Sequence, residues 1–491
     1  MHISIAGLQV CVGILLMSWA LGAPLIVGMV ASLAFGSTAL MTLSALGGSS
    51  PLIYVIFALL FCARMTLAPH VAQRISMVFT ASWVPWAVCG LAIYAAVTAA
   101  LLPRLFAGLT SVFVAGREYG VVQVTLAPRA GNLTQTSYFV LGALTFVGLS
   151  ALLVSLPQAF VILRRALLTW GLIIALGGVL DVSGRMLGGF DILDPIRTAS
   201  FAYLNDVEEA GFLRIAGTFS ESSSFAAASL SALAFSFVDW RRRGSKLSGG
   251  LAVALFTLLV FSTSSTAYVC LAVMALCSAG GLMRSSLRGG LKKPDLILAA
   301  LAVIALACLL FVTVSDPHRF DAFGKLIQST VLDKSSSQSA KERSYWNQIS
   351  LESLVDTFGI GIGFGSSRTS NWLIAVISQL GVIGTLLQLS LLIPLTWSAP
   401  HPSTRGFFTS PEADIQASLQ ACGATGVLSS ILIGGSADPG LLFFVILAGL
   451  VVLRCPGRAQ VTDLEPCSGD FGKPSRQLRN PGHASGLDRY N

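Results

Sequence analysis

Long apolar runs constrain this chain more than any other feature. Residues 4–46 contain no Asp, Glu, Lys or Arg, and a helix through them is interrupted only at Gly22 and Pro24. Charged residues make up 11% of the 491 residues and apolar residues 54%, whereas a soluble globular protein carries about 25% charged residues. A soluble protein of this length would lack the charge to cover its surface. The chain therefore has much of its surface against lipid.

The apolar runs predict an all-α polytopic membrane protein. A helix that crosses the hydrocarbon core needs about 20 mainly apolar residues. The first pair of runs is either two helices or one span with a re-entrant piece, so we expect about 12 to 13 transmembrane helices in one domain, residues 1–455. Residues 456–491 are rich in Gly, Pro and Ser and predict a disordered tail. The runs are 4–21, 22–46, 51–66, 78–101, 137–156, 166–181, 223–238, 248–263, 265–282, 296–314, 371–396, 415–434 and 440–454.

The distribution of Lys and Arg predicts the orientation. Five short connections hold 13 Lys and Arg in 63 residues, and three long connections hold 12 in 131 residues. The two sets alternate along the chain, so the positive-inside rule places the short set and the tail in the cytoplasm. The long loops, at 102–136, 182–222 and 315–369, are then extracytoplasmic.

Several functional classes are disfavoured by what the apolar runs lack. No Asp, Glu, Lys or Arg lies near the middle of a predicted span, whereas ion-coupled carriers place such groups there. The net charge of +8 arises from short basic clusters between apolar runs, which does not indicate a nucleic-acid surface. The cysteines and histidines show no metal-ligand spacing, so we expect no metal and no cofactor.

The second long loop ends in a motif that leads directly into an apolar helix, residues 214–225. Arg214 and Glu221 are expected at the membrane face, with Ser220 capping the helix and Glu221 in its first turn. The alternative is that this motif is only a helix cap with an Arg–Glu surface pair.

The third long loop ends in alternating glycines, among them Gly361, Gly363 and Gly365, followed by Ser366 and Arg368. Backbone N–H groups, the N-terminus of the next helix and Arg368 could together hold a phosphate. The spacing does not match a dinucleotide-binding fingerprint. The alternative is a flexible turn whose small residues serve helix packing.

Residues 340–355 of the same loop predict an amphipathic helix. Trp346, Ile349 and Leu354 fall near helical spacing, with polar groups opposite. Such a helix would lie on the outer face of the membrane with Arg343 towards the headgroups. A solvated helix that only anchors the loop is the alternative.

With these motifs in this order, the chain resembles the bacterial O-antigen and exopolysaccharide polymerase and O-antigen ligase superfamily. The resemblance covers roughly residues 1–455. It rests on an Arg-x-x-Gly-x-Phe-x-Glu element, a Ser/Thr-rich span end and a large loop that ends in Gly-x-Gly-x-Gly-Ser before a helix. The residues that carry it are Arg214, Gly217, Phe219, Glu221, Ser262 to Thr266, Gly361, Gly363, Gly365, Ser366, Gln379, Gly381 and Gly384.

The resemblance implies inverting glycosyl transfer from undecaprenyl diphosphate on the periplasmic face of the inner membrane. Arg214 and Arg368 match functional arginines of the superfamily and would stabilise the departing diphosphate. Glu221 is the candidate to orient or deprotonate the acceptor hydroxyl. Arg343 and the glycine motif would help to bind the lipid-linked oligosaccharide, and a flippase and a chain-length regulator would be pathway partners.

One departure separates the branches of this superfamily. Ligases and many polymerases carry a His-Asn or His-x-Ser element after the glycine motif, where this chain has Arg368-Thr369-Ser370-Asn371. This favours an exopolysaccharide or O-antigen polymerase and leaves the identity of the base open. An O-antigen ligase that transfers the glycan to lipid A core is one alternative. A transporter or flippase of lipid-linked glycans is the other.

Overall fold

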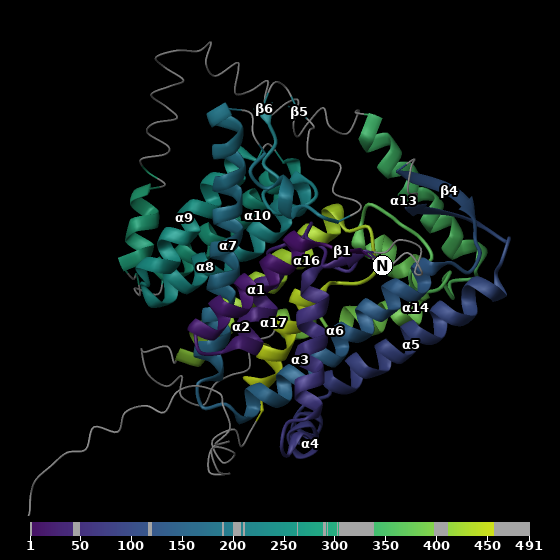
Figure 1. The fold of residues 1–491 in the computed structure, drawn as a ribbon, viewed down its shortest axis with the longest axis horizontal. Coiled ribbons are helices and arrows are strands. Elements are labelled where there is room, and N and C mark those ends of the chain that lie inside the picture. The colour runs from purple at the N-terminus through teal and green to yellow at the C-terminus, as the bar shows by residue number, and fades with distance from the viewer. Residues whose placement is uncertain are drawn as a thin grey trace, which may run out of the picture.

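The computed structural model describes residues 2–42, 50–115, 120–188, 191–199, 208–209, 212–262, 264–287, 291, 293–301, 303, 338–396 and 411–455. The predicted tail at 456–491, residues 315–337 of the third long loop and most of the predicted span 296–314 lie outside this part of the chain. Within it the protein is a helical bundle with three two-stranded sheets (Figure 1).

The named helices and strands follow the apolar runs closely. The helices are α1 (Ile5–Ala20), α2 (Pro24–Ser32), α3 (Ile53–Thr66), α4 (Val71–Ala81), α5 (Val84–Leu105), α6 (Ala130–Ser155), α7 (Ala159–Gly188), the 3₁₀ turn η2 (Asp194–Ile196), α8 (Ser222–Arg243), α9 (Lys246–Phe261), α10 (Ser265–Leu287), α13 (Gln338–Asp356), α14 (Trp372–Ser390), α15 (Ile393–Thr396), α16 (Pro411–Ile433) and α17 (Leu441–Val452). The antiparallel strand pairs are β1 (His2–Ile3) with β2 (Met41–Thr42), β3 (Ser111–Ala115) with β4 (Val121–Thr125), and β5 (Glu208–Glu209) with β6 (Phe212–Leu213).

The all-α, multi-pass membrane class is supported by the lengths of these helices. Six of the described helices are long and apolar enough to cross a membrane, and a seventh crossing exists if the bent pair α3 and α4 is one span. The helices α1, α9 and α17 are apolar but shorter. On α5, side chains such as Trp86, Ile93 and Leu101 are exposed, as expected of a surface that faces lipid.

Two of the predicted runs fold differently from a simple span. In the described part of the run 22–46, residues 22–42, the one helix is the nine-residue α2, about 14 Å long, followed by turns and an extended segment. The predicted run 78–101 is shifted, because α4 turns by 104° from α3 and α5 begins only at Val84, with Pro85 in its first turn. Pro is favoured there because its missing N–H has no helical partner.

The bundle has two distinct ends. Arg164 at the start of α7 pairs with Asp239 near the end of α8, so these helices are antiparallel and the end of α7 lies beside the start of α8. The end of the bundle where α7 ends and α8 begins also carries the β3–β4 hairpin and residues 434–440. We call it the hairpin end. The opposite side, with Arg164 and residues 241–243, is the basic end. In Figure 1, α4 lies far from the labels of β5 and β6.

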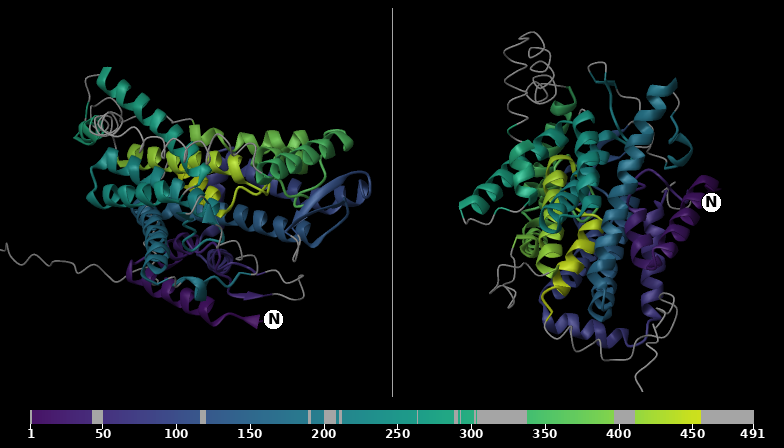
Figure 2. Two further views of the ribbon diagram at one scale, coloured as in Figure 1. Left: turned by 90° about the horizontal axis from the view of Figure 1, so that it is seen from above. Right: turned by 90° about the vertical axis from the view of Figure 1, so that its left-hand side faces the viewer.

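The core of the bundle is built around α17. Residues 443–452 are all buried, and α17 packs on α6 and α16. The two views of Figure 2 place the purple N-terminal helices α1 and α2 at one edge, where α2 packs against α7. The loops of the hairpin end therefore lie at the opposite end of the bundle from the basic residues of α8.

Candidate functional site

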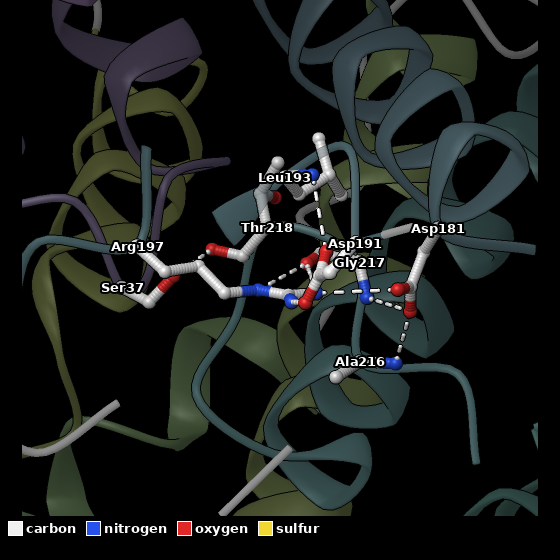
Figure 3. A network of polar contacts seen from close by, with 8 residues as sticks. All are labelled: Ser37, Asp181, Asp191, Leu193, Arg197, Ala216, Gly217 and Thr218. Atoms are coloured by element: carbon white, nitrogen blue, oxygen red, sulfur yellow. Dashed lines mark hydrogen bonds and ion pairs between the residues drawn. The ribbon is translucent and has the colours of Figure 1, made fainter. Parts of the chain in front are cut away.

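A buried ion pair shapes the segment that contains Arg214 and Glu221 (Figure 3). Asp181 Oδ2 accepts hydrogen bonds from the backbone N–H of Ala216 at 2.8 Å and of Gly217 at 2.9 Å. Its Oδ1 lies 3.3 Å from Arg197 NH2, and both side chains are 1% exposed. A carboxylate that accepts two backbone N–H groups and an ion pair has its buried charge compensated.

Arg197 closes the same network from the other side. Its NH2 donates to the carbonyl of Gly217 at 2.6 Å, its Nε to the same oxygen at 3.2 Å, and its NH1 pairs with Asp191. The segment 214–218 is therefore held at its amides by Asp181 and at a carbonyl by Arg197. The predicted span 166–181 ends at Asp181, and no motif marks Arg197. α7 in fact continues for two further turns, to Gly188.

The non-helical chain after α2 completes this corner. Ser37 donates from its N–H and its hydroxyl to the carbonyl of Thr218, at 3.1 and 2.9 Å, and the Thr218 hydroxyl donates to the carbonyl of Ala34. Backbone groups that leave a helix inside an apolar bundle need such partners. The non-helical chain that follows α2 and the segment around Arg214 therefore stabilise each other.

Glu221 is the N-cap of α8 rather than a residue of its first turn. It has extended dihedral angles, φ −156° and ψ 157°, and α8 begins at Ser222. The expectation that Ser220 caps this helix was wrong, because the chain enters the helix one residue later. Glu221 makes no capping bond, and its Oε1 accepts from the Ser224 hydroxyl at 3.2 Å. In the chain, the half-buried Arg214 precedes, and Glu221 follows, the two residues whose N–H groups bond to Asp181.

The glycine motif precedes α14 in sequence and packs closely against it. Gly361, Gly363 and Gly365 have φ of 92°, 91° and 77°, a region that favours glycine. A Cβ at Gly361 would lie 2.6 Å from the Gly381 nitrogen, and one at Gly363 would lie 2.7 Å from the carbonyl oxygen of Thr98. The glycines are therefore required by backbone packing, which was the alternative interpretation of this motif.

α14 is interrupted where the motif meets it. Gly381 has φ 65° and ψ −170° inside the helix. The freed backbone groups bond to the motif: Ile362 N–H donates to Ser378 O at 2.9 Å, and Val382 N–H donates to Gly359 O at 3.0 Å. Gln379, which the sequence noted only as part of the resemblance, accepts from Gly365 N–H at 2.8 Å and donates to Ser367 O at 2.9 Å.

These bonds change how the motif could meet a phosphate. The N–H groups of Ile362, Gly363 and Gly365 donate within the protein, and the Asn371 side chain accepts from two N–H groups at the start of α14. Ser366 accepts from the Asn132 side chain at 2.8 Å and donates to the carbonyl of Ile362 at 2.9 Å. An anion would have to displace these partners, so a role of the three glycines and Ser366 in substrate binding remains a prediction. Their observed role is to fix the chain that precedes Arg368.

Arg368 leaves this scaffold with an exposed side chain. Its N–H donates to the carbonyl of Phe113 in β3 at 2.7 Å, so the β3–β4 hairpin and the glycine motif position it together. The sequence marked Gln379 as part of the resemblance, but its hydrogen bonds to the glycine motif are visible only in the folded structure.

A helix over the predicted range 340–355 is confirmed as α13, Gln338–Asp356, whereas its amphipathic character is not, since Leu351 and Val355 are exposed. Ile349, Ser350 and Ser353 are buried on one side. Arg343 is exposed, and its carbonyl accepts from the Ser370 hydroxyl at 3.3 Å. α13 thus brings Arg343 into the neighbourhood of the residues that follow Arg368.

The structure brings the predicted residues to one end of the bundle, but in two groups. Arg214 and Glu221 belong to the segment held by α7, whereas Arg368, Arg343 and the glycine motif belong to a group built on α5, α6, α13 and α14. Among the described residues, no set of three or more His, Cys, Asp or Glu could hold a metal ion. The arrangement offers cationic side chains and carboxylates at the edge of an apolar bundle, which suits a ligand with a charged head and an apolar tail.

Comparison with known proteins adds no relative. No family model matches the chain, and no curated protein matches it.

Proposed function

We propose that the protein is a polysaccharide polymerase that joins lipid-linked oligosaccharide repeat units at the hairpin end of the bundle. The observation that carries this proposal is the gathering of Arg214, Arg343 and Arg368 at one end of a multi-pass bundle, with Glu221 at the start of α8. The family resemblance of the motifs supports the choice of substrate. The twelve to thirteen crossings that the sequence predicts belong to the same proposal.

In this reaction the bond between the sugar anomeric carbon and the diphosphate of undecaprenyl diphosphate breaks. A hydroxyl of the acceptor sugar forms the new bond to that carbon and gives up its proton. The departing diphosphate gains negative charge, which Arg214 and Arg368 stabilise through charge-assisted hydrogen bonds. A guanidinium group suits this task because its planar fork binds two phosphate oxygens at once.

The orientation follows from the charge of the two ends. The basic end carries Arg164, Arg165, residues 241–243 and Lys246 near the ends of α7, α8 and α9, and the positive-inside rule assigns such an end to the cytoplasm. The hairpin end is then periplasmic, where a flippase would deliver repeat units and a chain-length regulator would act. Both partners are part of the proposal.

The test is reconstitution of the purified full-length protein in liposomes with undecaprenyl-diphosphate-linked repeat units. Polymers of increasing length on the same lipid carrier are the expected result. Transfer of the glycan only to added lipid A core would replace the polymerase by a ligase. Movement of the lipid-linked unit between leaflets, without a new glycosidic bond, would identify a flippase and overturn the proposal.

A further inference from the structure

The loop between α16 and α17, residues 434–440, joins three parts of the hairpin end. The Thr369 N–H donates to the carbonyl of Gly435 at 3.2 Å, and Trp372 Nε1 donates to the carbonyl of Ala437 at 3.3 Å. The Ser436 hydroxyl donates to Gln135 Oε1 of α6 at 2.9 Å. The shape of this loop is therefore set by α6 and by the chain that enters α14.

The same loop supports the side chain of Arg368. A Cβ at Gly435 would lie 3.3 Å from both Cγ and Nε of Arg368, so this side chain lies along the loop before its guanidinium group reaches solvent. A side chain at position 435 would require Arg368 to shift by a few tenths of an ångström. The loop thus belongs to the Arg368 group of the candidate site.

Asp438 lies on this loop and forms two hydrogen bonds within it. Its Oδ1 accepts from the Gly440 N–H at 2.9 Å, and its own N–H donates to the Ser436 hydroxyl at 3.2 Å. Tyr54 of α3 is close enough to interact electrostatically with both Asp438 and Tyr138 of α6. Asp438 and both tyrosines are half-buried. Among the described residues, the second carboxylate oxygen of Asp438 has no hydrogen-bond partner.

We infer that Asp438 is the catalytic base that takes the proton from the acceptor sugar hydroxyl, an inference that rests on the proposed function. A carboxylate with one oxygen fixed by the backbone and the other unengaged is oriented to accept a proton. Tyr54, which interacts electrostatically with Asp438, adds a second group that can bind a hydroxyl. Arg368, whose side chain lies against Gly435 of the same loop, is placed for the departing diphosphate.

The proton balance of this step is simple. The acceptor hydroxyl forms the glycosidic bond, its proton passes to the Asp438 carboxylate, and the electron pair of the broken bond leaves with the diphosphate. Burial raises the pKa of Asp438 from its ordinary value to about 6, partly opposed by the hydrogen bond from Gly440. A carboxylate with this pKa is still largely ionised at neutral pH and is a stronger base than an ordinary one.

This inference changes the expected role of Glu221. Glu221 lies at the start of α8 in the other group, whereas Asp438 lies on the loop that supports Arg368. No sequence motif marks Asp438, so the sequence alone assigns it no role. Its candidate role comes from the loop contacts to α6, α14 and Arg368.

A purely structural role for Asp438 is separable, because its Oδ1 also shapes the start of α17. In Asp438→Asn the amide oxygen can still accept from Gly440, but the side chain no longer accepts a proton. Asp438→Glu keeps a carboxylate. Glu412→Gln is the matched control, since it neutralises an exposed carboxylate at the other end of α16.

The experiment measures the rate of chain growth by the reconstituted full-length protein between pH 5 and pH 8. We expect the wild-type rate to fall below about pH 6 as Asp438 is protonated, and D438N to lose about 100-fold or more at every pH. D438E should keep part of the rate, and that rate should still fall at low pH (an acid limb of the pH profile). E412Q should match the wild type. The thermal midpoint of each variant reports its folding.

Near-normal chain growth by D438N would overturn the inference and leave the polymerase intact. So would an acid limb that disappears in Glu221→Gln and persists in the residual activity of D438N. A wild-type protein that makes no polymer, but ligates or moves the lipid-linked unit, would overturn the proposed function itself.

Discussion

Two buried ion-pair groups stand on α7, one near each end, and they do different work. They are 17 residues apart, about 25 Å along the helix. At the basic end Arg164 binds Asp239 with two hydrogen bonds of 2.8 and 2.7 Å, and the Ser248 hydroxyl donates to the same carboxylate. At the hairpin end Asp181 binds Arg197 and the backbone of residues 216 and 217.

The difference lies in what each group holds. The basic-end group joins side chains of three helices, α7, α8 and α9, and so fixes how these helices pack. The hairpin-end group joins a helix to the backbone of a loop, and so fixes the shape of a segment that carries Arg214. The comparison teaches that one buried ion pair stabilises the scaffold and the other shapes the candidate site.

The largest effect on stability is expected from Asp239→Ala. It leaves Arg164, whose side chain is only 24% exposed, without its carboxylate, which costs about 3 kcal/mol. The thermal midpoint of the purified protein and its yield in membranes should both fall. The exposed Arg242 on the same helix provides the control, Arg242→Ala. An unchanged midpoint in D239A would show that this group does not hold the scaffold.

The largest effect on activity alone is expected from Arg214→Ala and Arg368→Ala. Each removes a charge that stabilises the leaving group, worth about 2.7–4 kcal/mol, or about 100- to 1,000-fold in rate. Polymer length in cells that lack the native gene measures the effect, and membrane insertion should be normal. Arg→Lys should also be poorly tolerated, because Lys lacks the bidentate fork. Polymers of normal length from both Ala variants would refute the site.

A smaller effect is expected from Asp181→Asn, which tests the loop-shaping role. The amide loses the charge that faces Arg197 and keeps one oxygen for the N–H groups of Ala216 and Gly217, at a cost of about 1–3 kcal/mol. Chain growth should fall more than the thermal midpoint does. A fall in midpoint as large as that of D239A would show that the two groups are equivalent and remove the distinction.

The smallest effect is expected from Arg243→Ala. Arg243 Nε lies 3.4 Å from Asp239 in an i,i+4 pair at the edge of the basic-end group. Such pairs contribute about 0.3–0.5 kcal/mol, because Arg164 already satisfies the same carboxylate. The thermal midpoint should shift by little, also in high salt. A loss close to that of D239A would mean that Arg243, rather than Arg164, is the main partner.

The sequence predicted the local features of the hairpin end well. Alternating connections of different charge predicted that Arg214 and Arg368 lie at the same end, and the spacing of Trp346, Ile349 and Leu354 predicted α13. The sequence did not predict the conformation of segments whose contacts come from distant parts of the chain. The glycines of the motif indicated open backbone for a ligand, but Gly381, Thr98 and Gly131 occupy that space.

What the sequence determined by itself is the class of protein: apolar runs of sufficient length must become helices in lipid, because only hydrogen bonds within the segment satisfy their backbone. Only the tertiary structure decided that α2 is short and that Arg197 faces Asp181. It also decided that the loop of Asp438 packs against the side chain of Arg368. These features depend on contacts between segments that lie tens to hundreds of residues apart. A single polar residue in a loop carries no periodic signal that would reveal such a contact in advance.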